Sequence, residues 1–134
     1  MRHEELAQIS KLRFENAKKL LSTAQSLIEL EDYKSSANRS YYAIFNAMRA
    51  ALALLKIDNK KHSGLMSSFR LHFIKTGIFD VELSDIITSL FEIRTQSDYN
   101  EFFIISKEEI VTQVNNAKRF VKEIEKYLKS KEII

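Results

Sequence analysis

The chain has 134 residues and a formal net charge of +3, and a charge this mild does not by itself indicate nucleic-acid binding. Cysteine is absent, which excludes disulfides, thiolate zinc sites and cysteine nucleophiles. Proline is also absent and there are two glycines, which favours long helices over a turn-rich β protein. Because no apolar run is long enough to span a membrane and the first residues lack a signal-peptide core, we expect a soluble cytoplasmic protein with no membrane partner.

The first two predicted helices cover about residues 3–30 and 32–57, and the short link between them favours an antiparallel arrangement. Asp32 stands where an N-cap residue would begin the second helix. Apolar residues recur in this helix at the i, i+4 and i+7 spacing of a buried face, so we predict that it is the most enclosed helix. The residues of that face are Ala37, Tyr41, Ile44, Phe45, Met48, Ala51, Leu52 and Leu55.

A second stripe of the same helix carries polar groups. Arg39, Tyr42, Asn46 and Arg49 follow one another at intervals of three, four and three residues. Polar groups on a largely buried helix are tolerated where they meet partners or water. We therefore expect the functional site where this stripe meets the polar run at residues 94–100.

A third helix is predicted to begin with Ser63 as its N-cap and to end at Gly77, which can adopt the left-handed backbone of a helix stop. Asp80 is the predicted N-cap of a fourth helix. The apolar stripe of this fourth helix continues into Arg94 and Asp98, so one face changes from apolar side chains to an i, i+4 ion pair.

The last predicted helix begins at Ser106, which forms a capping box with Glu109, and runs to about residue 130. The apolar segment at residues 100–105 is either an extended linker lying on the bundle or the end of the fourth helix. The sequence thus predicts an all-α, up-and-down bundle of four to five helices that forms one domain over residues 1–134.

Some aromatic side chains are hard to place inside a bundle this thin. A homodimer would cover part of this apolar surface, and we expect one. The residues concerned are Tyr33, Phe79, Phe102 and Phe103.

The strongest candidate site residues, for binding or for catalysis, are Arg94, Asp98 and Tyr99. One interpretation is an exposed helix ion pair, which contributes little. The other is an anion site, because a half-buried guanidinium needs acceptors and Arg39 would add a second cation suited to phosphate. The predicted ligand-binding set is Arg94, Asp98, Tyr99, Arg39, Tyr42 and Asn46.

The three histidines do not form an obvious site. His62, between Lys61 and Ser63, either captures phosphate at a helix start or belongs to a solvated basic loop, and we favour the loop. His72 is interpreted as a satisfied, half-buried side chain. Because no two histidines are spaced i, i+4, no metal site is expected, and no motif indicates a cofactor.

Four segments occur in a recognisable order: ANRSYYAIF at residues 37–45, HSG at 62–64, FIKTG at 73–77, and Arg94 followed by Asp98 and Tyr99. Together they resemble the HEPN domain, and most of all its small stand-alone prokaryotic branch associated with nucleotidyltransferases. The resemblance spans nearly the whole chain. It implies a helical bundle that dimerises, a cleft near the dimer interface, and a nucleotidyltransferase partner in a toxin–antitoxin type pair.

Several HEPN branches are metal-independent ribonucleases, in which an arginine is followed after four to six residues by a histidine. The resemblance places that arginine at Arg94, where it would hold the scissile phosphate. Tyr99, Asn100 and Glu101 occupy the histidine positions, and tyrosine, with a pKa of about 10, is a poor base. Glu101 also stands where the paired-toxin branch carries a tyrosine that its partner modifies with nucleotides.

Two outcomes follow from the missing histidine. Either His62 or His72 substitutes for it from another helix, or this branch binds its ligand without cleaving it. The leading hypothesis is a dimeric binding and regulatory module for a nucleotide, an RNA phosphate or a nucleotidyltransferase partner. The alternatives are a ribonuclease toxin with an unusual base and a helical interaction scaffold in which the polar cluster only fixes the register of the bundle.

Overall fold

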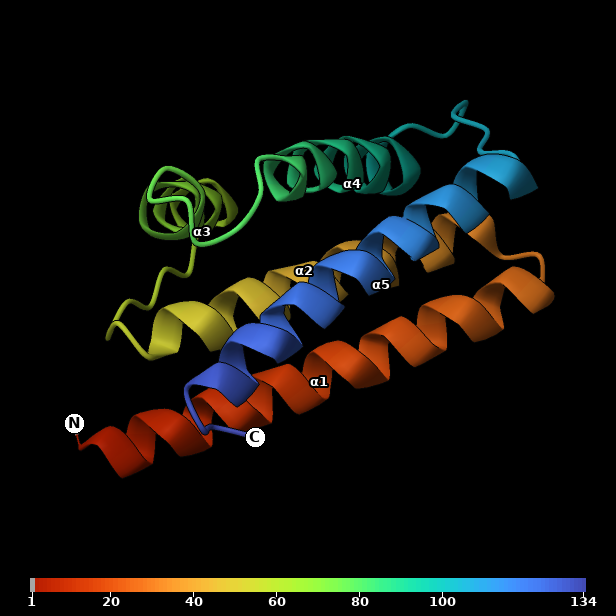
Figure 1. Ribbon diagram of the computed structural model, residues 1–134. Helices are drawn as coiled ribbons and strands as arrows, with labels where there is room; N and C mark the ends of the chain where they lie inside the picture. Colours follow the sequence, from red (N-terminus) through yellow and green to blue (C-terminus); the bar gives the residue numbers. More distant parts are fainter. Residues whose placement is uncertain (1) are drawn as a thin grey trace.

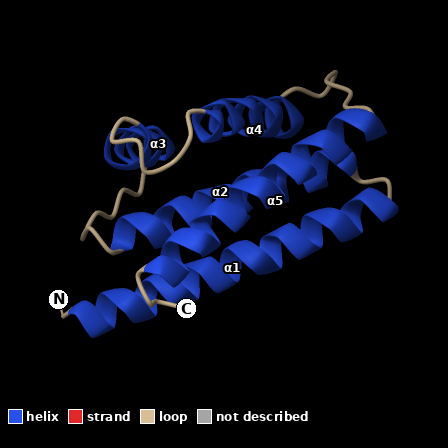
Figure 2. Cartoon of the chain, viewed as in Figure 1, coloured by secondary structure: helices blue, strands red, loops and turns tan. Residues whose placement is uncertain are grey.

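The structure is a computed structural model and describes residues 2–134. Within that part of the chain there are five α-helices and one short π-helical segment (Figures 1 and 2). Their bounds are α1 His3–Glu29, α2 Tyr33–Ala53, α3 His62–Phe69, η1 Arg70–Ile74, α4 Glu82–Tyr99 and α5 Lys107–Ser130. The predicted all-α bundle is therefore confirmed. Across residues 2–134 there is no helix with the length and apolar character needed to cross a membrane.

Helix α2 lies at the centre of the arrangement, as its apolar pattern predicts. Figure 1 shows α1, α2 and α5 lying lengthwise beside one another, with α4 along the other side of α2 and α3 crossing the bundle. More than half of the residues of α2 are buried, and several of them are alanines. Small side chains allow neighbouring helices to approach closely, so α2 contacts α1, α3, α4 and α5.

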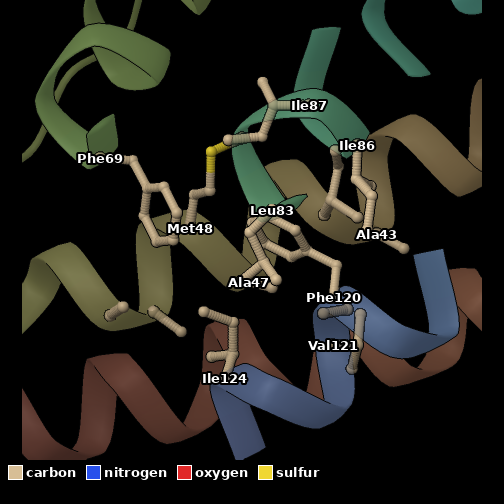
Figure 3. Packing of buried hydrophobic residues seen from close by; sticks show 14 of the residues in the cluster. Ala43, Ala47, Met48, Phe69, Leu83, Ile86, Ile87, Phe120, Val121 and Ile124 are labelled. Carbon is tan, nitrogen blue, oxygen red and sulfur yellow. The ribbon is translucent and has the colours of Figure 1, made fainter. Parts of the chain in front are cut away.

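The core joins side chains from four helices around α2. In Figure 3, Met48 of α2 lies close to Phe69 of α3 and Ile87 of α4, and Leu83 lies near Phe120 of α5. All five of these side chains are buried. This packing fixes the position of α4 against α2, and the candidate site lies between those two helices.

Two predicted helix starts are confirmed by their local geometry. The Asp32 carboxylate accepts a hydrogen bond from the Ser35 amide at 3.2 Å, and the Ser106 hydroxyl accepts one from the Glu109 amide at 3.1 Å. Gly77 has the predicted left-handed conformation, with a φ of 80°, but it does not end the third helix. Helix α3 ends at Phe69, the π-helical segment η1 ends at Ile74, and Gly77 lies in the turn that follows.

Other boundaries differ from the prediction. Helix α3 begins at His62 with Lys61 at the N-cap position, two residues earlier than expected, and Ser63 is not its N-cap. Helix α4 begins at Glu82, after Val81, although the Asp80 carboxylate does accept a hydrogen bond from the Glu82 amide at 3.0 Å. Helix α2 ends at Ala53, and the chain then turns through Lys56, which has a φ of 62°.

The apolar segment after α4 is a connection and not a continuation of the helix. Its turn is held by the Asn100 side chain, which accepts a hydrogen bond from the Phe102 amide at 3.0 Å. Phe102 is 90% exposed, whereas Phe103 is half-buried. Phe79 is buried against other rings, among them Phe73, so the expectation that it needs a second copy to cover it is wrong.

Candidate functional site

Arg94 lies between α4 and α2. Its side chain is 12% exposed, and Nη2 donates a hydrogen bond to the Tyr42 hydroxyl at 2.8 Å. Its Nε lies 3.0 Å from Oδ2 of Asp98, one turn further along α4. The Arg94 half of the ion pair is therefore largely buried, whereas Asp98 is exposed, so the pair lies at the edge of the bundle and is not a wholly exposed surface pair.

Three tyrosine rings surround the Arg94 guanidinium. Its central carbon lies 5.4 Å from the ring centre of Tyr41, 5.3 Å from that of Tyr42 and 5.6 Å from that of Tyr99. A cation in contact with aromatic faces is stabilised most where water is excluded. Tyr41 is fully buried and Tyr99 is 74% exposed, so Tyr99 forms the side of the cluster that faces solvent.

The hydrogen bonding of Arg94 is incomplete. Its Nε–H is close to Asp98 but is not aligned for a hydrogen bond, and it has no other hydrogen-bond partner among the described residues. A buried donor without an acceptor costs about 1–3 kcal/mol. The guanidinium thus keeps a donor that an additional acceptor could satisfy.

A second arginine is connected to the cluster through Asn38. The Asn38 amide nitrogen donates to Oδ2 of Asp98 at 2.9 Å, and Arg39 donates from Nη1 to the Asn38 side-chain oxygen at 2.6 Å. Arg39 is half-buried. The cluster of Arg94, Asp98 and Arg39 therefore carries two positive charges and one negative charge.

His62 joins the same cluster from the start of α3. Its Nδ1 lies 2.6 Å from the Tyr41 hydroxyl, and its ring stacks on the Tyr41 ring with centres 5.6 Å apart. It also packs against Phe45, at a centre-to-centre distance of 4.7 Å. The interpretation of His62 as part of a solvated loop is wrong, because the chain after α2 folds back onto the aromatic face of that helix.

Burial changes the acid–base behaviour of this histidine and of the tyrosine beside it. Burial lowers the pKa of His62, and the Arg94 cation lowers it further, so the neutral imidazole is favoured near pH 7. Burial raises the pKa of Tyr41, an effect that the nearby Arg94 cation only partly opposes. The Tyr41 phenol therefore keeps its proton, and the pair is a neutral hydrogen-bonded couple beside a cation.

Two members of the predicted polar stripe have other partners. The Asn46 side chain donates to the Tyr42 backbone oxygen at 2.9 Å and so stays on its own helix. Arg49 contacts Asp58 in the connection after α2. None of the hydrogen bonds or ring contacts given above for the Arg94 cluster involves His72, the second of the two histidines considered as a substitute for the missing one.

Sequence reasoning missed Asn38 and undervalued His62. Asn38 is four residues before Tyr42, so the polar stripe of α2 extends one turn further back than predicted. That spacing is visible in the sequence. Nothing in the local sequence indicates that His62 packs on Tyr41, because the contact depends on the path of the connection between α2 and α3.

The profile of the HEPN domain family matches residues 10–127 of the chain. The chain belongs to the HEPN domain family. The matched range includes Arg94, Asp98, Tyr99 and His62, so the whole cluster lies inside the HEPN domain.

Related proteins match this HEPN protein over most of their length. A Methanocaldococcus jannaschii protein named "Putative toxin MJ0142" is 36% identical over 120 residues, which are 90% of this chain and 82% of the relative. A second protein of that organism, "Putative toxin MJ0605", is 32% identical over 94% of this chain and 90% of its own. A Thermotoga maritima "UPF0332 protein" is 33% identical over 84% of this chain and 85% of its own.

Proposed function

We propose that this HEPN protein binds a phosphate group of a nucleotide or an RNA through the cluster of Arg94, Asp98, Tyr99 and Arg39. In this proposal it is a cytoplasmic binding and regulatory protein of the toxin–antitoxin type, paired with a nucleotidyltransferase. The observation that carries the proposal is the largely buried Arg94 guanidinium whose Nε–H has no hydrogen-bond partner among residues 2–134. Two of the similar proteins are named as toxins, which supports the toxin–antitoxin assignment.

The charge balance of the cluster favours an anion. Arg94 and Arg39 bring two positive charges, and Asp98 supplies one negative charge. A phosphate oxygen that displaces the Asp98 carboxylate from the Nε–H of Arg94 would complete its hydrogen bonding and offset the surplus charge. Because Tyr99 is exposed on the solvent side, its ring is placed to contact the ligand as well as the guanidinium. Asn46, bonded to its own helix, is not part of this proposed site.

A homodimer fits the apolar surface next to the cluster. Phe102 and Ile104 are both exposed in the connection that follows Tyr99. Exposed apolar side chains this close together are typical of a contact surface. In the proposal a second copy covers them and brings the two Arg94 clusters near the dimer interface. Light scattering at micromolar concentration should give twice the mass of the chain, and a monomeric mass would remove the dimer.

Phosphate binding is tested with a matched pair of variants. Arg94→Met and Arg119→Met each remove one positive charge, but Arg119 is exposed and pairs with Glu82 on the surface. Fluorescence anisotropy with a labelled single-stranded RNA, and competition by ATP, should show binding weakened at least about tenfold in Arg94→Met, as the loss of a charged hydrogen bond implies. Arg119→Met should bind like the unchanged protein. Equal losses in both variants would mean that only net charge matters.

Cleavage is a second candidate function, favoured by the position of His62. If Nδ1 of the neutral imidazole donates its proton to Tyr41, Nε2 is free to accept the proton of a ribose 2′-hydroxyl. The 2′-oxygen would then bond to phosphorus, the bond from phosphorus to the 5′-oxygen would break, and the protonated imidazole would return the proton to the leaving oxygen. Arg94 would hold the phosphate during this step.

A metal-free assay on total RNA separates binding from cleavage. If His62 acts as the base, cutting is lost in both His62→Gln and Arg94→Met, whereas RNA binding survives in His62→Gln. If no RNA is cut and RNA or ATP still binds, the protein is a binding module. A scaffold without ligand predicts that Arg94→Met changes stability alone and that neither RNA nor ATP binds the unchanged protein.

A further inference from the structure

A second pair of arginines lies near the C-terminal end of α2. Arg13 of α1 and Arg49 of α2 contact the same carboxylate oxygen, Oδ1 of Asp58, at 3.5 Å and 3.3 Å. Arg13 also donates from Nη1 to the backbone oxygen of Arg49 at 3.3 Å. None of these residues belongs to the Arg94 cluster, so this site is independent of the function proposed for Arg94.

The two arginines are poorly neutralised. Their side chains are 16% and 29% exposed, whereas the Asp58 carboxylate that they share is 52% exposed. Both distances exceed the roughly 2.7–2.9 Å of a charge-assisted hydrogen bond. The Nε–H of Arg49 has no hydrogen-bond partner among the described residues. Burial lowers the pKa of Arg13, and repulsion from Arg49 adds to that effect.

A cavity of about 300 Å³ opens beside Arg13 and Asp58. Its remaining walls are mostly apolar, with one further cation, Lys56, at the turn after α2. The volume is at the lower end of the roughly 300–1,000 Å³ typical of small-molecule pockets. Surplus positive charge therefore adjoins an apolar cavity of ligand size. The apolar lining residues are Leu6, Ile9, Ala53 and Ile57.

We infer that this cavity is a second binding site, for a small anion with an apolar tail, such as a medium-chain carboxylate. The carboxylate lies against Arg13 and Lys56, the two cations that line the cavity, and Arg49 behind Arg13 adds to the positive charge there. The tail lies against the apolar walls and is removed from water. A small, fully polar anion would leave those walls unused, so the site discriminates against free phosphate.

The inference is tested with octanoate, octanol and inorganic phosphate as probes. Two-dimensional NMR spectra should show saturable shifts at Ile9, Ala53 and Ile57 with monomeric octanoate, at pH 7. Octanol lacks the charge and phosphate lacks the tail, so both should bind at least about tenfold more weakly, as the loss of one charged hydrogen bond or of a few buried methylenes implies.

Two variants locate the carboxylate of the probe. Arg13→Met should weaken octanoate binding at least about tenfold, because a charged hydrogen bond from a residue that lines the cavity is lost. Arg119→Met is the control with the same charge change on an exposed side chain. If Arg13→Met fails to fold, Lys56→Asn takes its place, because Lys56 is exposed and asparagine tolerates its left-handed backbone. This variant should weaken octanoate binding by a smaller factor.

Three results would overturn the inference. One is the absence of saturable shifts at the cavity with octanoate, which would mean that the two arginines only attach the connection after α2 to the bundle. Another is equal binding of phosphate and octanoate. The third is octanoate binding that is the same in the unchanged protein, in Arg13→Met and in Lys56→Asn.

Discussion

Two groups of arginine side chains contact α2, and their charges are balanced in different ways. Arg94 meets one carboxylate, one tyrosine hydroxyl and three aromatic rings. Arg13 and Arg49 share one half-exposed carboxylate, and neither makes a cation–π contact within residues 2–134. The aromatic ring faces thus stabilise the positive charge of Arg94 in part, as a counter-ion would. The pair at the other site lacks that support.

Removing the buried ring of Tyr41 should have the largest effect on the stability of the protein. Tyr41→Ala should lower the free energy of unfolding by about 3–5 kcal/mol, the usual cost of truncating a buried aromatic side chain. Ile9→Ala at the wall of the cavity, where the side chain is half-buried, should cost about 1 kcal/mol. Chemical denaturation at pH 7 measures both. Equal costs would show that the aromatic cluster contributes no more than an ordinary cavity wall.

Removing the Arg94 cation should have the next largest effect on stability. Arg94→Met leaves the Tyr42 hydroxyl and Asp98 without their main partner, at an expected cost of about 1–3 kcal/mol. Arg94→Lys keeps the charge but loses the planar group that contacts three rings, so it should restore only part of the loss. Full recovery with lysine would show that charge alone holds the cluster together.

The charge balance of Arg13 and Arg49 is tested by removing the carboxylate that they share. Asp58→Asn leaves Arg13 and Arg49 facing each other without an anion. The expected cost is about 1 kcal/mol, and it should shrink as salt is added because salt screens the repulsion. Denaturation at low and high ionic strength measures this. A cost that does not depend on salt would contradict the idea of surplus charge at this site.

The smallest expected effect is a pH dependence from His62. Its pKa is lowered in the folded protein, mainly by burial, so the unfolded chain binds the proton more tightly. Stability should therefore be fully present above the ordinary histidine pKa of about 6.5 and should fall as pH decreases below it. Denaturation between pH 7 and pH 5 measures the slope. His62→Gln should have a shallower slope, and an unchanged slope would contradict the burial of this imidazole.

The helices of this protein are largely predictable because local rules fix them. The apolar spacing of α2, the Asp32 and Ser106 caps and the Gly77 turn all act within a few residues. The start of α3 lies two residues before the predicted one, and His62, its first residue, contacts Tyr41. A contact across 21 residues of sequence leaves no trace in the local pattern.

The candidate site was predictable in part for the same reason. Arg94, Asp98 and Tyr42 lie on regular helix faces, so spacing alone suggested that they meet. The position of Arg49 was not predictable, because its partner Asp58 lies in the connection after α2. The path of that connection depends on how the chain turns at Lys56 after leaving the helix.

The central claim, that Arg94 binds a phosphate, is tested most directly by observing its own Nε–H. In ¹H–¹⁵N spectra of the arginine side chains, ATP or a short RNA should shift the Arg94 resonance in a saturable way. The Nε–H of Arg70, which already donates to the Ser84 hydroxyl at 2.8 Å, should stay in place. If saturating ATP and RNA both leave the Arg94 resonance unmoved, the account is contradicted.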